Sequence, residues 1–172
     1  MNIFGHFKTI TKHRHQVIRN CFKAGIGFQG LFHDLSKYSY TEFSVGARYY
    51  RGYKSPNDVE RELYGYSLAW LHHKGKNKHH FEYWYDYDTK TREIVPVDMP
   101  LKYLKEMLCD RIAASKIYQG KNYSEAHPLE YFNSGKARKY MHEKNADLME
   151  QWLTMLAEKG EDELFGYIRT LK

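Results

Sequence analysis

Apolar side chains recur at intervals of three or four residues along most of the chain, a spacing typical of amphipathic helices. The first such run covers residues 7–24 and ends before two glycines, Gly25 and Gly27. Glycine commonly follows the last turn of a helix. The same pattern predicts a helix over residues 28–35, one from Ser39 or Thr41 to Gly52, and later helices over residues 56–73 and 100–120 and on either side of Gly160.

Strand signals are confined to one short segment. Residues 86–97 have no helical period, and Asp88, Thr89 and Lys90 are typical of a turn between two short extended pieces. The sequence therefore predicts an all-α fold with a short hairpin near residue 90. A chain of 172 residues fits one domain, covering residues 1–172.

Composition excludes several classes of protein. The chain is 42% hydrophobic and 28% charged, which is typical of a folded protein and not of a disordered one. It has no uncharged apolar stretch of about 18 residues and no leader-like run, so we expect no membrane contact. Cys21 and Cys109 lie in apolar helical contexts and are predicted to be small core residues, not a disulfide, which favours a cytoplasmic location.

The formal net charge of +6 favours anionic partners such as phosphorylated metabolites, nucleotides or nucleic acids. Lysine and arginine are, however, spread along the chain without a dense basic block. A solvated basic surface is therefore the simpler interpretation, and nucleic-acid binding is the less favoured one.

Ten histidines, unevenly distributed, change this picture. Imidazole and carboxylate together suit Mn, Fe, Zn, Ni or Co, and neighbouring His33 and Asp34 could both ligate one such ion. Lys37, four positions after His33, would lie on the same side of a helix and could hold a substrate phosphate. A helix-capping aspartate beside a core histidine explains the dipeptide equally well.

Two further residues favour the metal interpretation. His13 lies in the preceding helix, and Asp110 lies in an otherwise apolar helix. A carboxylate on such a face is costly to bury unless it is paired, hydrogen-bonded or metal-bound, with a salt bridge as the alternative. With His33 and Asp34 these residues would form a metal cage.

The order of these four residues resembles the HD superfamily of metal-dependent phosphohydrolases. The spacing from His13 to Val17 is similar to that of its first helix, and residues 33–37 are similar to its His-Asp-x-x-Lys segment. Residues 8–84 more closely resemble a family of small HD-like proteins of bacteria and phages with no characterised activity. That closer resemblance is carried by residues 30–43, 49–57 and 65–84.

The resemblance implies a single HD-like helical bundle in which His13, His33, Asp34 and Asp110 bind a first metal. It also implies that a second metal would be held by members of the pairs His72–His73 and His79–His80, although their spacing departs from that of the binuclear HD proteins. Alternatively, these pairs form a basic loop with Lys74, Lys76 and Lys78 that grips a phosphate. His15 is a less suitable ligand than His13, and we expect His6, His127 and His142 at the surface.

The function implied is hydrolysis of a phosphate ester, with a nucleotide as first candidate, by water activated on one or two divalent metal ions. Lys37, with Arg14 or Arg111, would neutralise phosphoryl charge, Lys74 would assist binding, and Asp34 or Asp110 could take a proton from the water. Two other classes stay open: an HD-type di-iron oxygenase, and a non-enzymatic binder of nucleotides or nucleic acid. An exposed helix pair near the C-terminus would support an oligomer.

Overall fold

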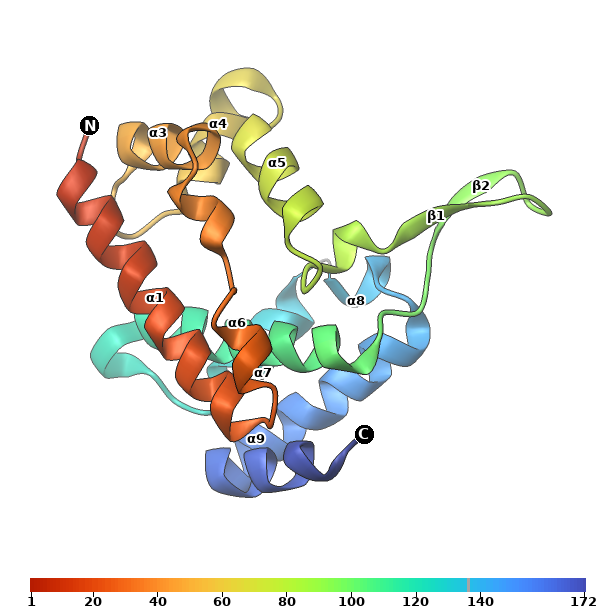
Figure 1. Ribbon diagram of the computed structural model, residues 1–172. Coiled ribbons are helices and arrows are strands. Elements are labelled where there is room, and N and C mark those ends of the chain that lie inside the picture. The colour runs from red at the N-terminus through yellow and green to blue at the C-terminus, as the bar shows by residue number, and fades with distance from the viewer. Residues whose placement is uncertain (136) are drawn as a thin grey trace.

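The computed structural model describes residues 1–135 and 137–172, and nearly all regular structure in these residues is helical (Figure 1). The all-α prediction is confirmed. The α-helices are α1 (Ile3–Lys23), α2 (Gly27–Gly30), α3 (Tyr40–Tyr49), α4 (Pro56–Tyr64), α5 (Leu68–Lys76), α6 (Leu101–Gln119), α7 (His127–Ser134), α8 (Ala137–Tyr140) and α9 (Glu143–Thr170). Short 3-10 helices are η1 (Leu35–Tyr38), η2 (Phe81–Tyr83) and η3 (Gly120–Asn122).

The hydrophobic core lies where α1, α6 and α9 meet. Leu104, Leu108 and Ile112 of α6 have no exposed surface and recur every four residues, so one side of that helix is buried. Trp152 of α9 is also fully buried in this core. Cys21 and Cys109 are buried and free, as the sequence predicts. None of the described helices is both long and apolar enough to cross a membrane.

The predicted hairpin is also confirmed. Strand β1 (Tyr85–Asp88) pairs antiparallel with β2 (Glu93–Pro96), in a register that sets Tyr85 opposite Pro96. The hairpin projects from the helical body (Figure 1).

Two helix predictions are wrong, for backbone reasons. The helix expected over residues 28–35 ends at Gly30, and Asp34 takes a left-handed conformation with φ of 53° that no α-helix accommodates. The helix expected over residues 56–73 is two helices, because Gly65, with φ of 80°, ends α4. The predicted break near Gly160 is present as a kink within α9, where φ is 84°.

Candidate metal centre

One group of side chains, here called the first cluster, joins α1, the turn after α2, and α6. His13 Nε2 lies 2.9 Å from Asp110 Oδ1. His33 Nε2 lies 3.6 Å from the same oxygen and 3.3 Å from Asp34 Oδ2. The candidate ligand atoms of the cluster all lie within 4.8 Å of one another. The structure thus brings together the four residues that the resemblance implies for a first metal.

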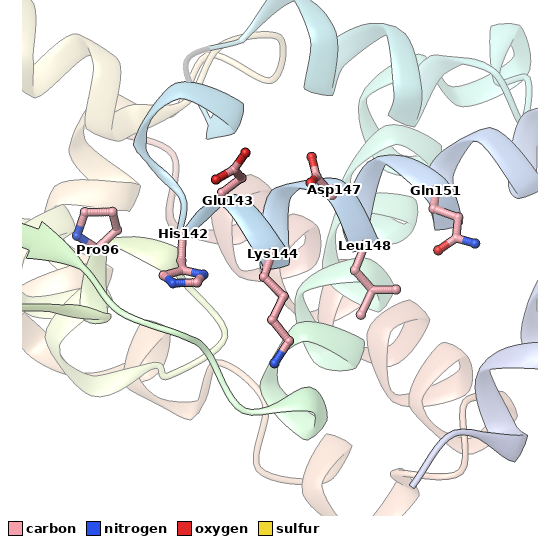
Figure 2. A pocket seen from close by; sticks show the side chains of 7 residues that line it. All are labelled: Pro96, His142, Glu143, Lys144, Asp147, Leu148 and Gln151. Carbon is pink, nitrogen blue, oxygen red and sulfur yellow. The ribbon is translucent and has the colours of Figure 1, made fainter.

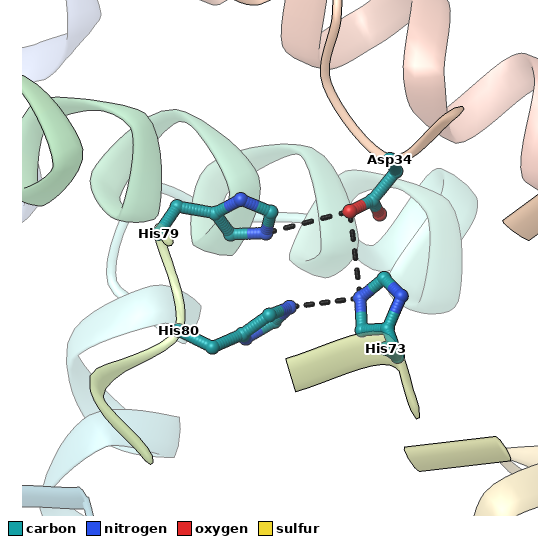
Figure 3. A group of neighbouring side chains, drawn as sticks. All are labelled: Asp34, His73, His79 and His80. Atoms are coloured by element: carbon teal, nitrogen blue, oxygen red, sulfur yellow. Dashed lines mark hydrogen bonds and ion pairs between the residues drawn. The ribbon is translucent and has the colours of Figure 1, made fainter. Parts of the chain in front are cut away.

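A second cluster shares Asp34 with the first and contains His73, His79 and His80 (Figure 3). Nε2 of His73, in α5, is 3.4 Å from Asp34 Oδ1, and Nε2 of His79, in the segment after α5, is 3.5 Å from that oxygen. His80 Nε2 lies 2.9 Å from His73 Nε2. The two oxygens of Asp34 therefore face different clusters, which is the placement expected of a carboxylate that bridges two ions.

The backbone around Asp34 explains how one side chain reaches both clusters. Aspartate tolerates the left-handed conformation better than most residues, and such conformations persist only where surrounding contacts hold them. Arg14 supplies these contacts, because its Nε donates to the His33 carbonyl over 3.2 Å and its Nη2 donates to the Leu31 carbonyl. Arg14, expected to bind substrate, thus fastens the turn that carries His33 and Asp34.

Glu106 of α6 contacts one histidine of each cluster. Its Oε1 lies 2.8 Å from His33 Nδ1 and 3.2 Å from His79 Nδ1. A carboxylate at Nδ1 fixes the ring and directs the other nitrogen to the cluster, as carboxylates behind metal-bound histidines do. Nε2 of both rings is buried with no hydrogen-bond partner among the described residues.

Glu42 of α3 does the same for the second cluster. Its Oε2 lies 2.7 Å from His73 Nδ1, so His73 Nε2 is left facing Asp34. Its Oε1 lies 2.7 Å from Nδ1 of His72, whose side chain is 30% exposed. Of the four histidines expected at a second metal, the structure brings His73, His79 and His80 into the cluster and leaves His72 outside it.

The electrostatics of the clusters favour ionised carboxylates. Burial opposes ionisation of Asp34, but His33 and Lys37 outweigh it and hold the pKa of Asp34 well below its usual range. Burial likewise opposes ionisation of Asp110, while the hydrogen bond with His13 and the nearby His33 imidazole hold its pKa well below the usual value. Hard anionic oxygens are thereby available to a cation.

The imidazoles divide into two kinds. Burial, followed by the charge of His79, holds the pKa of His80 well below its ordinary value, so His80 is neutral, as a metal ligand must be. Burial acts in the same direction on His33, but Asp34 and Asp110 outweigh it and raise the pKa of His33 well above its ordinary value. A cation bound at His33 Nε2 would displace that proton.

The basic residues expected at the substrate lie in different surroundings. Lys37 Nζ is 2.6 Å from Asp34 Oδ2, although Lys37 lies in η1 and not on the helix that the sequence predicts. The Arg111 guanidinium packs over the Phe132 ring, 5.2 Å from its centroid. Lys74 is half-buried on α5 and belongs to neither cluster.

Sequence reasoning missed the two carboxylates that orient the histidines. Glu106 precedes Asp110 by four residues, so one helix face carries both, and this spacing was the available signal. Glu42 has no comparable signal. The prediction of His6 at the surface is wrong, because its side chain is packed between α1 and α3 against Phe43 and is only 8% exposed.

Two pockets differ in their position relative to the clusters. A pocket of about 110 Å³ adjoins the second cluster and is lined there by Lys37, Glu42 and His73. A wider hollow, of about 810 Å³, lies between the end of β2 and the start of α9 (Figure 2). Residues such as Lys144 and Asp147 line the wider hollow, and no member of either cluster does, so only the smaller pocket is connected with the chemistry.

The donor atoms of the two clusters could hold a metal ion. Within the described residues, Asp34 Oδ1, His33 Nε2 and His79 Nε2 are buried without hydrogen bonds. Buried polar atoms are costly unless a partner satisfies them. His33 Nε2 belongs to the first cluster, and Asp34 Oδ1 and His79 Nε2 belong to the second, so each cluster has an unsatisfied atom that a cation could satisfy. The chain therefore contains buried His, Asp and Glu groups that could hold a metal ion.

Comparison with known proteins gives a family but no activity. No curated protein and no solved structure matches the chain. A family model does match, over residues 2–155, and its description is a family of unknown function, DUF5662. Every member of the two clusters lies within this matched range. The chain belongs to the DUF5662 family.

Proposed function

We propose that this protein is a metal-dependent phosphohydrolase whose two clusters, which share Asp34, would each hold a divalent metal ion. The observation that carries the proposal is the position of Asp34, whose two oxygens face two separate sets of buried imidazoles. The first ion would be held by His13, His33, Asp34 and Asp110, and the second by Asp34, His73, His79 and His80. The order of these residues, which resembles the HD superfamily, supports the same activity.

The donor set determines which ions are suitable. Imidazole nitrogens mixed with carboxylate oxygens suit Mn, Fe, Zn, Ni or Co better than Mg or Ca. When bound, such ions supply a water of lowered pKa and polarise a phosphoryl oxygen.

The protein's own residues would do the remaining work. Lys37 is placed to balance charge on the phosphoryl group, because its ammonium already lies beside Asp34 at the edge of the smaller pocket. The Asp110 side chain is 19% exposed, against 2% for Asp34, so Asp110 is the better placed carboxylate to accept a proton from water. Glu106 and Glu42 hold the imidazoles in place.

The test is the metal content of protein purified without added metal, followed by reconstitution. We expect about two equivalents in the wild type, and the loss of both in Asp34→Asn, because the amide cannot bridge two ions as a carboxylate does. His13→Ala should lose one equivalent and His79→Ala the other. His72→Ala is the matched control, since His72 lies next to His73 but outside both clusters, and it should keep both ions.

Activity decides between the remaining classes. Hydrolysis of a phosphate ester by the metal-loaded wild type, lost in Asp34→Asn, would support the proposal. Full metal content in Asp34→Asn would contradict it. Two irons with oxygen-dependent turnover would identify an HD-type oxygenase instead, and tight nucleotide binding without turnover would identify a binder.

A further inference from the structure

The pocket of about 110 Å³ is in contact with the second cluster through one of its members, His73. Lys37 and the buried Glu42 also line it. Further lining residues come from α1, from the loop between α3 and α4, and from the start of α4, and they include Thr9, Tyr50 and Lys54. A molecule in this pocket would therefore lie beside the candidate metal centre.

Two lysines, Lys37 and Lys54, line this pocket. Both carry a nearby carboxylate: Lys37 is paired with Asp34, and Lys54 is paired with Glu62, whose side chain is 58% exposed. Ion pairs with exposed partners are weak, so Lys54 is free to exchange Glu62 for an anion in the pocket.

The remaining wall groups also suit an anion. The one carboxylate among them, Glu42, already accepts from His72 and His73. The Thr9 and Tyr50 hydroxyls are hydrogen-bonded to each other over 2.7 Å, so one donates to the other and the second keeps its hydrogen for a ligand oxygen. Asn57 lies in the first turn of α4, where the helix dipole favours negative charge.

The size of the pocket limits what it can enclose. Sites that enclose whole drug-sized ligands measure about 300–1,000 Å³, several times more than this pocket. A phosphoryl group with a few further atoms fits, whereas a nucleoside would remain outside.

We infer that this pocket binds the phosphate of a small phosphate monoester, with Lys54 as the cation that recognises it opposite Lys37. The inference rests on the proposed function, whose substrate class it specifies. A monoester phosphate carries a charge of about −1.5 to −2 at pH 7, which two ammonium groups can balance. The inference assigns phosphate recognition to Lys54 and not to the basic segment of residues 74–78, because no lysine of that segment lines the pocket.

The first experiment titrates inorganic phosphate into the metal-loaded protein by calorimetry. Lys54→Gln should weaken phosphate binding about tenfold, the loss expected for one charge-assisted hydrogen bond. Glu62→Gln should bind phosphate at least as tightly as the wild type, because it removes the competing carboxylate. Lys90→Gln, which removes the same charge from the exposed turn of the hairpin, should change affinity less than twofold.

Unchanged phosphate affinity in Lys54→Gln would overturn the inference, and so would a loss confined to Lys74→Gln. Metal content, measured on the same samples, keeps the two proposals apart. If two ions are bound and Lys54→Gln has no effect, the metal centre is supported and the phosphate pocket is contradicted. If no metal is bound and phosphate binding still depends on Lys54, the phosphate pocket is supported and the metal centre is contradicted.

The second experiment tests the size of the substrate by competition against bound phosphate. A three-carbon phosphate monoester and a nucleoside monophosphate should bind within about threefold of each other, because the nucleoside gains no enclosed contact. Lys54→Gln should weaken both to the same extent. A nucleoside monophosphate that binds more than tenfold tighter than the three-carbon ester would overturn the assignment of a small substrate.

Discussion

Glu106 shows how much of the candidate centre depends on a residue outside the two clusters that share Asp34. Its Oε1 lies within 3.2 Å of Nδ1 on both His33 and His79, so it accepts from one ring of each cluster. Although burial opposes its ionisation, hydrogen bonds from these two histidines lower the pKa of Glu106 to about 2. Glu106 is therefore an anion at neutral pH.

Glu106→Gln should consequently weaken metal binding about 10–100-fold, the usual effect of losing a group that orients metal-bound histidines. The glutamine can keep an oxygen at the position of Oε1, but it loses the negative charge that strengthens the hydrogen bonds to the imidazoles. Metal affinity would be measured by competition with a chelator, and circular dichroism would verify the helices. Glu130→Gln on exposed α7 is the control, and equal affinities in the two variants would show that Glu106 does not position the histidines.

For individual residues, the sequence predicts the candidate metal ligands better than it predicts the glutamates that orient them. His13, His33, Asp34 and Asp110 are recognisable because a fixed order of metal-binding residue types resembles a known one. Glu42 and Glu106 are ordinary helical glutamates in sequence, and their partners lie 31 and 73 residues away. Which histidine a glutamate faces is decided by how the helices pack, and no local pattern encodes that.

One helix can contribute both to the hydrophobic core and to the candidate metal centre. In α6, Leu104 and Leu108 are fully buried in the core, while Glu106 and Asp110 face the clusters. Its apolar period made α6 predictable from end to end. The turn after α2 could not be predicted from the local sequence. Asp34 takes its left-handed conformation there because Arg14, from another helix, donates hydrogen bonds to the neighbouring carbonyls.

The crossing of α1 and α3 gives a prediction for an element contact. A Cβ added at Gly46 would lie 2.0 Å from His6 Nε2, so the two helices approach where only glycine fits. Gly46→Ala should lower the free energy of unfolding by about 1–3 kcal/mol, even though alanine is the better helix former. Denaturant titration would measure this.

Gly166→Ala in α9 is the control for that substitution, because a Cβ there meets no atom within 4 Å. It should be neutral or stabilising by up to about 1 kcal/mol, since only the helix propensity changes. Equal effects of the two substitutions would mean that His6 does not limit the approach of α3 to α1.

For the whole molecule, the two clusters place several charged groups in the interior, and without a cation these groups lower the stability of the fold. Three carboxylates, those of Asp34, Glu106 and Asp110, lie in a largely buried region. The residues of this region come from α1, the turn after α2, the segment around α5, and α6. Buried charges without full compensation are destabilising. Several of their imidazole and carboxylate atoms have no hydrogen bond in the described part of the chain. A divalent cation that binds the folded chain alone would therefore stabilise it.

The expected size of this effect follows from mass action. At free metal concentrations 100–1,000 times the dissociation constant, the free energy of unfolding should rise by about 3–4 kcal/mol for each bound ion, and chelation should remove the increase. Asp34→Asn should lose the metal-dependent part, whereas His72→Ala should retain it. Thermal unfolding with and without chelator measures this directly. If the wild type unfolds at the same temperature in both conditions, no ion binds the folded state, and the orphaned atoms around Asp34 must be satisfied by water, which would leave them without a role in hydrolysis.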